Sequence, residues 1–233
     1  MNTPAHCLVL MRHGHSEWNL SNRFTGWTDI PLTEQGLLEA DTAGKQLAAA
    51  GLQFDEVHTS ALYRTQQCAN RLLAAANHPA IPHFASWRLN ERHYGQLQGM
   101  NKQEIFEQWG EEDSRRWWRG YTEPPPPLAM DDPRHPRNSP AYAGLNPALL
   151  PRSESLADCQ RRMLPYWYDV LEQRIKANKR LLVISHGNTL RSLVMYLDNI
   201  APNAIEKVEI APGVPMIYRF NEAMDVVGWE WLE

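Results

Sequence analysis

Two short segments with apolar cores in this chain each lead into a histidine followed by a glycine. Cys7–Met11 precedes such a pair at His13, and Arg180–Ser185 precedes another at His186. Continuous apolar strands are typical of a parallel sheet that is buried by helices on both faces. Because parallel strands end at one edge of a sheet, where ligands bind, the pattern predicts that the two histidines meet at one site.

The rest of the hydrophobic pattern alternates between strand-like and helix-like segments, which favours an α/β fold. We expect one catalytic domain over residues 1–233, a three-layer sandwich with a mainly parallel sheet flanked by helices. The further expected strands are 54–59 and 216–220, the latter followed by a short tail. The expected helices are 33–50, 60–76 with Ser60 as its cap, 101–109, 153–177 with a kink at Pro165, and one through Leu190–Leu197.

Composition limits the classes of protein to which the chain can belong. It has 233 residues, of which 43% are apolar and 21% charged, and its formal net charge of -4 gives no support for nucleic-acid binding. Its three cysteines show no paired spacing, which indicates a reducing compartment. The sequence shows neither a signal-peptide pattern nor an apolar run of about 20 residues. We therefore expect a cytoplasmic enzyme that has no membrane partner.

One segment, residues 120–151, is unusually rich in proline. It contains four consecutive prolines at Pro124–Pro127 and five more up to and including Pro151, together with opposite charges such as Arg134 and Asp132. Loops longer than about 15 residues in a compact domain are usually functional lids or disordered segments. We interpret this segment as a lid-like insertion beside the site.

Cationic side chains are expected at the same sheet edge as the histidines. Arg12 adjoins His13, and Arg64 lies in the opening turn of the helix predicted after the second strand. Guanidinium groups and helix N-termini bind phosphate oxygens well. A neutral His13 could then attack phosphorus in line while these groups stabilise the negative charge of the transition state.

Each of these residues also has a simpler explanation. His186 could be a buried core residue, Arg64 could lie on a solvated helix face, and His13 with His15 could bind zinc, although no cysteine pair or carboxylate cluster completes a metal site. Two other classes therefore stay open. A zinc-dependent hydrolase would be sensitive to chelators, and a non-enzymatic phosphometabolite sensor would bind its ligand without turnover.

Longer blocks of the sequence resemble a known family. The block Leu10–Asn19, which contains Arg-His-Gly, resembles the signature of the histidine phosphatase superfamily. Further blocks, within about residues 7–220, are similar to those of the 2,3-bisphosphoglycerate-dependent phosphoglycerate mutases. These blocks are Asn22–Trp27, Leu89–Gly95, Leu97–Gly99, Asn101–Lys102, Trp118–Gly120, Glu154–Leu156, Ser185–Asn188 and Gly213–Pro215.

The resemblance implies a role for each matching residue. His13 would be the phosphohistidine, Glu91 the general acid and base on the glycerate hydroxyl, and His186 a group that stabilises the transferring phosphoryl group. The residues implied to hold that phosphate are Arg12, Asn19, Arg64, Gly187 and Asn188. Those implied to bind the rest of the substrate are Thr25, Gly26, Arg92, Tyr94, Lys102, Trp118 and Arg119.

The implied reaction is the interconversion of 3-phosphoglycerate and 2-phosphoglycerate in glycolysis and gluconeogenesis. It would be primed by 2,3-bisphosphoglycerate, need no metal, and occur in a homodimer or a homotetramer. The alternative within the superfamily is a phosphatase that acts on a small phosphometabolite, with water as the final acceptor of the phosphoryl group.

The chain departs from the family pattern at three places. His15 stands where a glutamate is common, and Trp118 stands where the first of two adjacent arginines is usual. Arg116 is a poor substitute for that arginine because positions two apart on a helix face different directions. The sequence also ends at Glu233, before the C-terminal tail of longer members. Lids keep a phosphohistidine from water, so we expect the loss of that tail to favour phosphatase leakage.

Overall fold

Six strands form one mixed sheet in the computed structural model, which describes residues 5–232. The order across the sheet is β3-β2-β4-β1-β5-β6. The first four of these strands are parallel to one another, and β5 and β6 are antiparallel to their neighbours. The strands are β1 His6–Arg12, β2 Glu56–Ser60, β3 His83–Ser86, β4 Leu181–Ser185, β5 Pro215–Phe220 and β6 Val226–Trp231.

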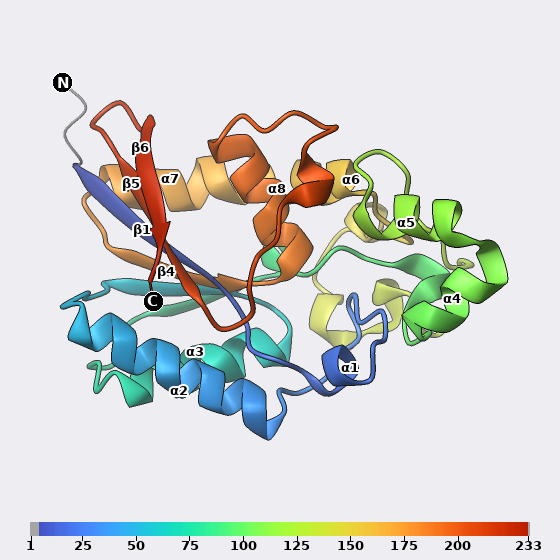
Figure 1. Ribbon diagram of the computed structural model, residues 1–233, viewed down its shortest axis with the longest axis horizontal. Helices are drawn as coiled ribbons and strands as arrows, with labels where there is room; N and C mark the ends of the chain where they lie inside the picture. Colours follow the sequence, from blue (N-terminus) through green and yellow to red (C-terminus); the bar gives the residue numbers. More distant parts are fainter. Residues whose placement is uncertain (1–4, 233) are drawn as a thin grey trace.

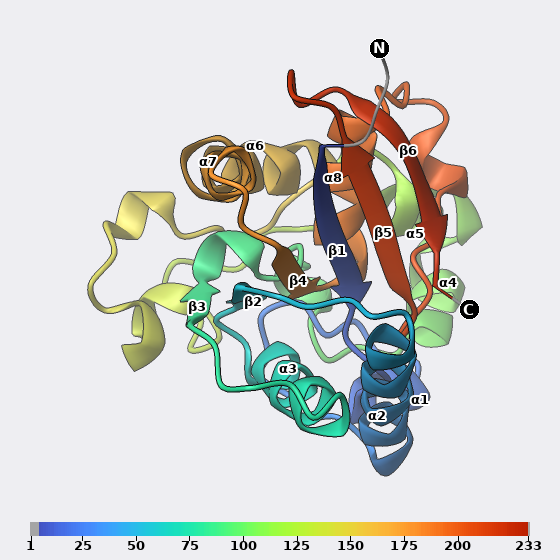
Figure 2. The same cartoon turned by 90° about the vertical axis from the view of Figure 1, so that its left-hand side faces the viewer.

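Helices cover both faces of this sheet (Figures 1 and 2). One face carries α2 and α3, the other carries α6, α7 and α8, and the pair α4 and α5 lies beyond the end of the sheet. This confirms the predicted three layers. The helices are α1 Glu17–Leu20, α2 Glu34–Ala49, α3 Tyr63–Ala75, α4 Lys102–Trp109, α5 Glu111–Arg119, α6 Leu156–Tyr166, α7 Glu172–Lys176 and α8 Gly187–Leu197.

The central strand β1 divides its side chains between two cores. Leu8 and Leu10 pack with the apolar side chains of α6, α7 and α8. Val9 and Met11 pack with those of α2 and α3. Helices cover both faces of β1, so the side chains that point to each face are apolar, and the strand contains a continuous apolar run. Its carboxyl end is therefore fixed at the middle of the sheet edge.

The helix predicted to start at Ser60 begins three residues later, so the predicted start was wrong. Ser60 is the last residue of β2, and α3 begins at Tyr63. The Ser60 hydroxyl still accepts a hydrogen bond from Leu62 N at 3.1 Å, so it stabilises the turn between the strand and the helix. The hydroxyl is thereby placed at the sheet edge, close to the end of β4.

The long helix predicted over 153–177 is three consecutive segments. Ser155 caps α6 by accepting a hydrogen bond from Asp158 N, so the helix begins after residue 155. A π-helical turn at Trp167–Leu171 separates α6 from α7 and begins two residues after Pro165, which lies in the last turn of α6. Proline removes one backbone donor from a helix, and such irregular turns are common where the normal hydrogen-bond pattern is broken.

The structure contains elements that the sequence pattern did not predict. Among the strands and α-helices, these are β3, β6, α1 and α5. Both strands are at the edges of the sheet, and β6 contains Gly228 and Glu230 within a partly exposed run. None of the helices within residues 5–232 has a segment long and apolar enough to cross a membrane.

Candidate active site

Two histidines meet at the carboxyl edge of the sheet. Arg12 and Ser185 are partners in the parallel pairing of β1 with β4, so His13 and His186 follow at the same level. His13 N donates to Ser185 O at 3.1 Å. The two imidazole rings lie edge to face, with centroids 4.9 Å apart, and both are buried. The structure thus brings together the histidines that the sequence pattern placed at one edge.

The hydrogen bonds of His13 fix which ring nitrogen is free to react. Nδ1 lies 2.6 Å from the carbonyl oxygen of Gly14. A carbonyl only accepts, so Nδ1 carries the proton and Nε2 presents its lone pair. Burial, and then the positive charges of Arg64 and Arg12, hold the pKa of His13 well below its ordinary value. His13 is therefore neutral at pH 7, and its Nε2 has the lone pair that a nucleophile would need.

Arg64 reaches His13 from the first turn of α3. Its Nε lies 3.3 Å from His13 Nε2, and its other two nitrogens donate to the carbonyls of Thr28 and Gly26. Burial lowers the pKa of Arg64 to about 10, so the guanidinium remains charged at pH 7. The sequence already indicated this residue, and the two carbonyls show what holds its buried charge in place.

His186 is oriented by the residue that ends β2. Its Nε2 lies 2.8 Å from Ser60 Oγ, whereas its buried Nδ1 has no hydrogen-bond partner among residues 5–232. Burial is the largest cause that lowers the pKa of His186, followed by the charge of Arg64. His186 is also the N-cap of α8, whose free N–H groups favour an anion at this point.

Glu91 faces the same helix end. Its Oε1 accepts hydrogen bonds from Asn188 N at 3.2 Å and from Arg92 N at 2.8 Å. The amide group of Asn188 in turn donates to the Tyr94 hydroxyl at 2.8 Å. These contacts place a carboxylate beside the histidines, as a proton carrier for a bound hydroxyl would require.

A buried ion pair supports the backbone of Glu91. Arg162 pairs with Glu154 at 2.6 Å and donates to the carbonyls of Asn90 and Glu91. The Trp27 indole also donates to the Glu91 carbonyl at 2.6 Å. The sequence analysis did not indicate Arg162, because its partners come together only in the folded chain.

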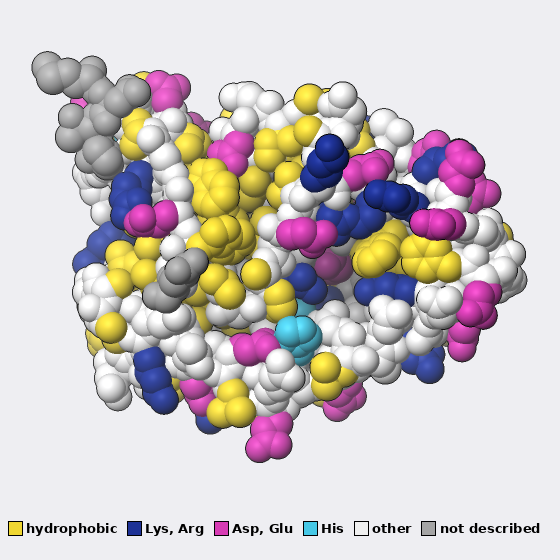
Figure 3. Space-filling view, viewed as in Figure 1, with side chains coloured by type: hydrophobic (Ala, Val, Ile, Leu, Met, Phe, Trp, Pro, Cys, Tyr) yellow, Lys and Arg dark blue, Asp and Glu magenta, His cyan; other side chains and the backbone are white. Residues whose placement is uncertain are grey.

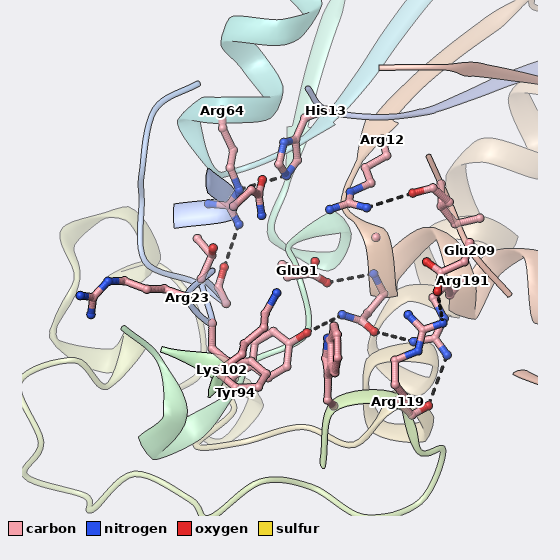
Figure 4. Close-up of a pocket in the computed structure, with 18 residues that line it drawn as sticks. Arg12, His13, Arg23, Arg64, Glu91, Tyr94, Lys102, Arg119, Arg191 and Glu209 are labelled. Carbon is pink, nitrogen blue, oxygen red and sulfur yellow. Dashed lines mark hydrogen bonds and ion pairs between the residues drawn. The ribbon is translucent and has the colours of Figure 1, made fainter. Parts of the chain in front are cut away.

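His13, Arg64 and Glu91 line one cavity (Figure 4), and its mouth is visible in Figure 3 as a hollow where Lys and Arg side chains gather. His186 is fully buried against His13 and is not itself part of the cavity wall. The wall contains six cationic side chains and two carboxylates. The cations are Arg12, Arg23, Arg64, Lys102, Arg119 and Arg191, and the carboxylates are Glu91 and Glu209. Asn19, Thr25, Gly26, Tyr94, Trp118, Gly187 and Asn188 also line it.

Buried donors around the cavity fit an anion with several oxygens. Arg12 Nε and Thr25 Oγ1 are buried and have no hydrogen-bond partner among the described residues. The side-chain oxygen of Asn19 accepts from Ser16, which leaves its amide nitrogen as the free donor. Unpaired buried polar groups are costly, so these donors indicate a phosphate-like ligand.

Arg92 is the one residue of the implied substrate-binding set that does not line this cavity. It is completely buried, donates to the carbonyls of Trp117 and Trp118, and stacks on the Tyr94 ring at 4.6 Å. Arg92 therefore supports the wall from behind.

Arg23, Arg191 and Glu209 line the cavity although the sequence analysis did not select them. Arg23 belongs to the block Asn22–Trp27, but no role was inferred for it, and no short motif marks Arg191 or Glu209. Arg191 lies on α8 and Glu209 lies between α8 and β5, so only the fold brings them to the same cavity as Arg23.

The structure also shows where Trp118 lies and whether Arg116 replaces the arginine that is usual at position 118. The Trp118 ring lines the cavity and lies 5.0 Å from Lys102 Nζ. Arg116 is exposed and pairs with Glu112 at 2.8 Å, so it does not replace the missing arginine.

The proline-rich segment lies against the support of the site. Tyr142 contacts the Trp27 ring at 5.0 Å, and its hydroxyl accepts from Asn90 at 2.8 Å. Leu128 and Leu150 are buried as well. No residue of 120–151 lines the cavity of the described chain, so its role as a lid remains a prediction.

His15 is engaged outside the cavity. Its Nδ1 lies 2.7 Å from the Glu39 carboxylate. Within residues 5–232, no three His, Cys, Asp or Glu side chains are grouped so that they could hold a metal ion.

Comparison with known proteins finds relatives over nearly the whole chain. The histidine phosphatase superfamily (branch 1) profile matches residues 8–229. The chain is 47% identical over 231 residues to a 2,3-bisphosphoglycerate-dependent phosphoglycerate mutase of Nitratidesulfovibrio vulgaris, covering 97% of this chain and 91% of that one. It is 49% identical over 215 residues to the same enzyme of Thermobifida fusca, covering 92% and 87%.

Solved structures show the same fold at lower identity. YhfR of Bacillus stearothermophilus aligns with a TM-score of 0.72 at 23% identity, covering 95% of this chain and 94% of that one. A mycobacterial glucosyl-3-phosphoglycerate phosphatase aligns with a TM-score of 0.72 at 19% identity, covering 97% of each chain.

Proposed function

The chain belongs to the 2,3-bisphosphoglycerate-dependent phosphoglycerate mutases of the histidine phosphatase superfamily, and we propose that His13, Glu91 and His186 carry out its reaction. The enzyme interconverts 3-phosphoglycerate and 2-phosphoglycerate through a phosphohistidine, primed by 2,3-bisphosphoglycerate. The observation that carries the assignment of residues is the neutral His13, whose Nδ1 proton is held by Gly14 O and whose Nε2 lies beside Arg64.

In the proposed priming step, His13 Nε2 attacks phosphorus and the bond from phosphorus to the substrate oxygen breaks. Arg12, Arg64 and the N–H groups at the start of α8 lie where they can stabilise the equatorial oxygens. The Nδ1–H bond to Gly14 keeps the imidazole oriented while a positive charge develops on it. His186 adds a second ring beside the phosphoryl group.

Glu91 supplies and removes the proton. When a glycerate hydroxyl attacks the phosphohistidine, the N–P bond breaks, an O–P bond forms, and Glu91 accepts the hydroxyl proton. When His13 then reclaims the other phosphate of the bisphosphate, Glu91 returns that proton to the oxygen that leaves. One carboxylate therefore serves both half-reactions, and the enzyme ends the cycle in its starting protonation state.

Two further features belong to this proposal. The resemblance supports a homodimer or a homotetramer, and the unpaired cysteines support a location in the cytoplasm.

Phosphorus NMR of the purified enzyme with 3-phosphoglycerate tests the proposal. EDTA is present throughout, and catalytic 2,3-bisphosphoglycerate is either added or omitted. A 2-phosphoglycerate signal that depends on the primer is the expected result. Inorganic phosphate in its place would mean that water takes the phosphoryl group, and the chain would then act as a phosphatase.

A further inference from the structure

Glu209 is a carboxylate in the wall of a cavity that is lined by six cationic side chains. It lies in the loop that precedes β5, lines the cavity wall, and pairs with Arg119 at 2.6 Å. Its side chain is 75% exposed, whereas that of Arg119 is only 16% exposed. Figure 4 shows Glu209 and Arg119 away from the His13 end of the cavity, next to Arg191. We call this part of the wall, formed by Lys102, Trp118, Arg119, Arg191 and Glu209, the outer end.

The bond between Glu209 and Arg119 is easily replaced. Arg119 Nη2 carries two hydrogens but has three acceptors, namely the carbonyls of Glu206 and Val208 and the carboxylate of Glu209. The carbonyls keep the guanidinium in place without Glu209. An exposed ion pair of this kind is worth little net free energy, because water and ions compete for both partners.

The outer end also has donors that await an anion. Arg191 is 3% exposed, and its Nε has no hydrogen-bond partner among residues 5–232. Lys102 Nζ lies over the Trp118 ring, and no carboxylate within the described chain pairs with it. Trp118 itself contributes no charge. The outer end therefore offers an anion three cationic groups, on Lys102, Arg119 and Arg191, and Glu209 adds one negative charge beside them.

We propose that Glu209 is a specificity-determining residue that competes with the second phosphate of the ligand for Arg119. This inference rests on the proposed function, in which one phosphate lies at His13 while the other lies at the outer end. Glu209 occupies Arg119 in the free enzyme, gives way when the outer phosphate binds, and returns when it leaves. It thereby weakens the binding of every ligand with an outer phosphate and leaves phosphoryl transfer at His13 unchanged.

The sign of the effect distinguishes competition from simple support of Arg119. If Glu209 competes, Glu209→Gln lowers the KM for 3-phosphoglycerate and the half-saturating concentration of 2,3-bisphosphoglycerate by a common factor of about three to ten, the size expected for one unit charge near a dianion in a solvated site. If Glu209 only positions Arg119, the same change raises both constants. The effect should shrink at high salt.

Glu206→Gln is the matched control, because it removes one negative charge from the same loop while its carbonyl bond to Arg119 remains. We expect both constants to stay within twofold of the parent enzyme in this variant. Phosphorylation of His13 at saturating bisphosphate should be equal in Glu206→Gln and in the parent enzyme. Unchanged or raised constants in Glu209→Gln, or an equal decrease in Glu206→Gln, would overturn the inference.

Calorimetric titration with 2,3-bisphosphoglycerate separates this inference from the function on which it rests. If the parent enzyme shows no primed turnover, the proposed function fails. The titration still compares the affinity of the parent for the bisphosphate with that of Glu209→Gln and Glu206→Gln. Tighter binding in Glu209→Gln alone supports competition at Arg119. Equal binding in the parent and in Glu209→Gln refutes it.

Discussion

The imidazoles of His13 and His186 are set at 72° to each other with their centroids 4.9 Å apart, although one follows β1 and the other follows β4. Both rings are buried, and burial is the largest cause that lowers the pKa of each. Two neutral rings can lie this close without repulsion. A phosphoryl group on His13 would bring negative charge beside His186 and favour the protonated form of that ring.

Replacement of His13 tests the nucleophile. His13→Ala should abolish acid-labile labelling of the protein by 2,3-bisphosphoglycerate, because His13 is the one histidine of residues 5–232 that lines the cavity. His15→Gln is the control, because Glu39 holds His15 outside the cavity. This variant should still be labelled at His13. Labelling that persists in His13→Ala would show that another residue carries the phosphoryl group.

Replacement of Glu91 separates phosphorylation from mutase turnover. Glu91→Gln keeps the shape of the side chain but cannot accept a proton, so the overall rate should fall by about 10²- to 10⁴-fold. Slow phosphorylation of His13 by the bisphosphate should remain. Rapid-quench labelling and steady-state turnover, measured on the same preparation, check both statements. A normal turnover rate would refute the proton role of Glu91.

The pH dependence of His13 phosphorylation follows from its lowered pKa. Protonation of Nε2 would block the attack, but the pKa of His13 lies well below 6.5, so the rate should show no decrease due to His13 between pH 8 and pH 6.5. Arg64→Met removes a positive charge beside the ring and therefore raises that pKa. The acid limb of the rate profile should move to higher pH in this variant. A limb at the same pH in both proteins would mean that Arg64 does not set the charge of His13.

Removal of the buried ion pair between Arg162 and Glu154, which supports Glu91, should cause a large loss of stability. Arg162→Met leaves Glu154 buried without its partner, which should cost about 3–5 kcal/mol in the free energy of unfolding. The exposed Arg161, which pairs with Asp158, is the matched control, and Arg161→Met should change stability by less than about 1 kcal/mol. Urea denaturation of both variants measures the difference. Equal losses would show that the buried pair does not support this region.

How much of the site could be predicted depends on the kind of residue. His13 and His186 follow apolar strands, and Arg64 lies in the first turn of the helix after β2, so the rule that parallel strands end at one edge was enough to bring them together. The role of Glu91 came from the resemblance alone, because nothing in its local sequence distinguishes it from a surface glutamate. Its position depends on Arg162 and Trp27, which contact its carbonyl from distant parts of the chain.

The sequence by itself determined the layered α/β fold, the position of His13 and His186 at one edge of the sheet, and the family. Hydrophobic periodicity and the residues at strand ends are local features of the sequence, so they can be recognised without knowledge of long-range contacts. Only the tertiary structure decided that Glu209 and Arg191 reach the cavity, that Arg92 stays behind its wall, and that β6 extends the sheet. Long side chains can point in many directions, and an edge strand is stabilised chiefly by its neighbour, so both outcomes depend on packing that no short stretch of sequence encodes.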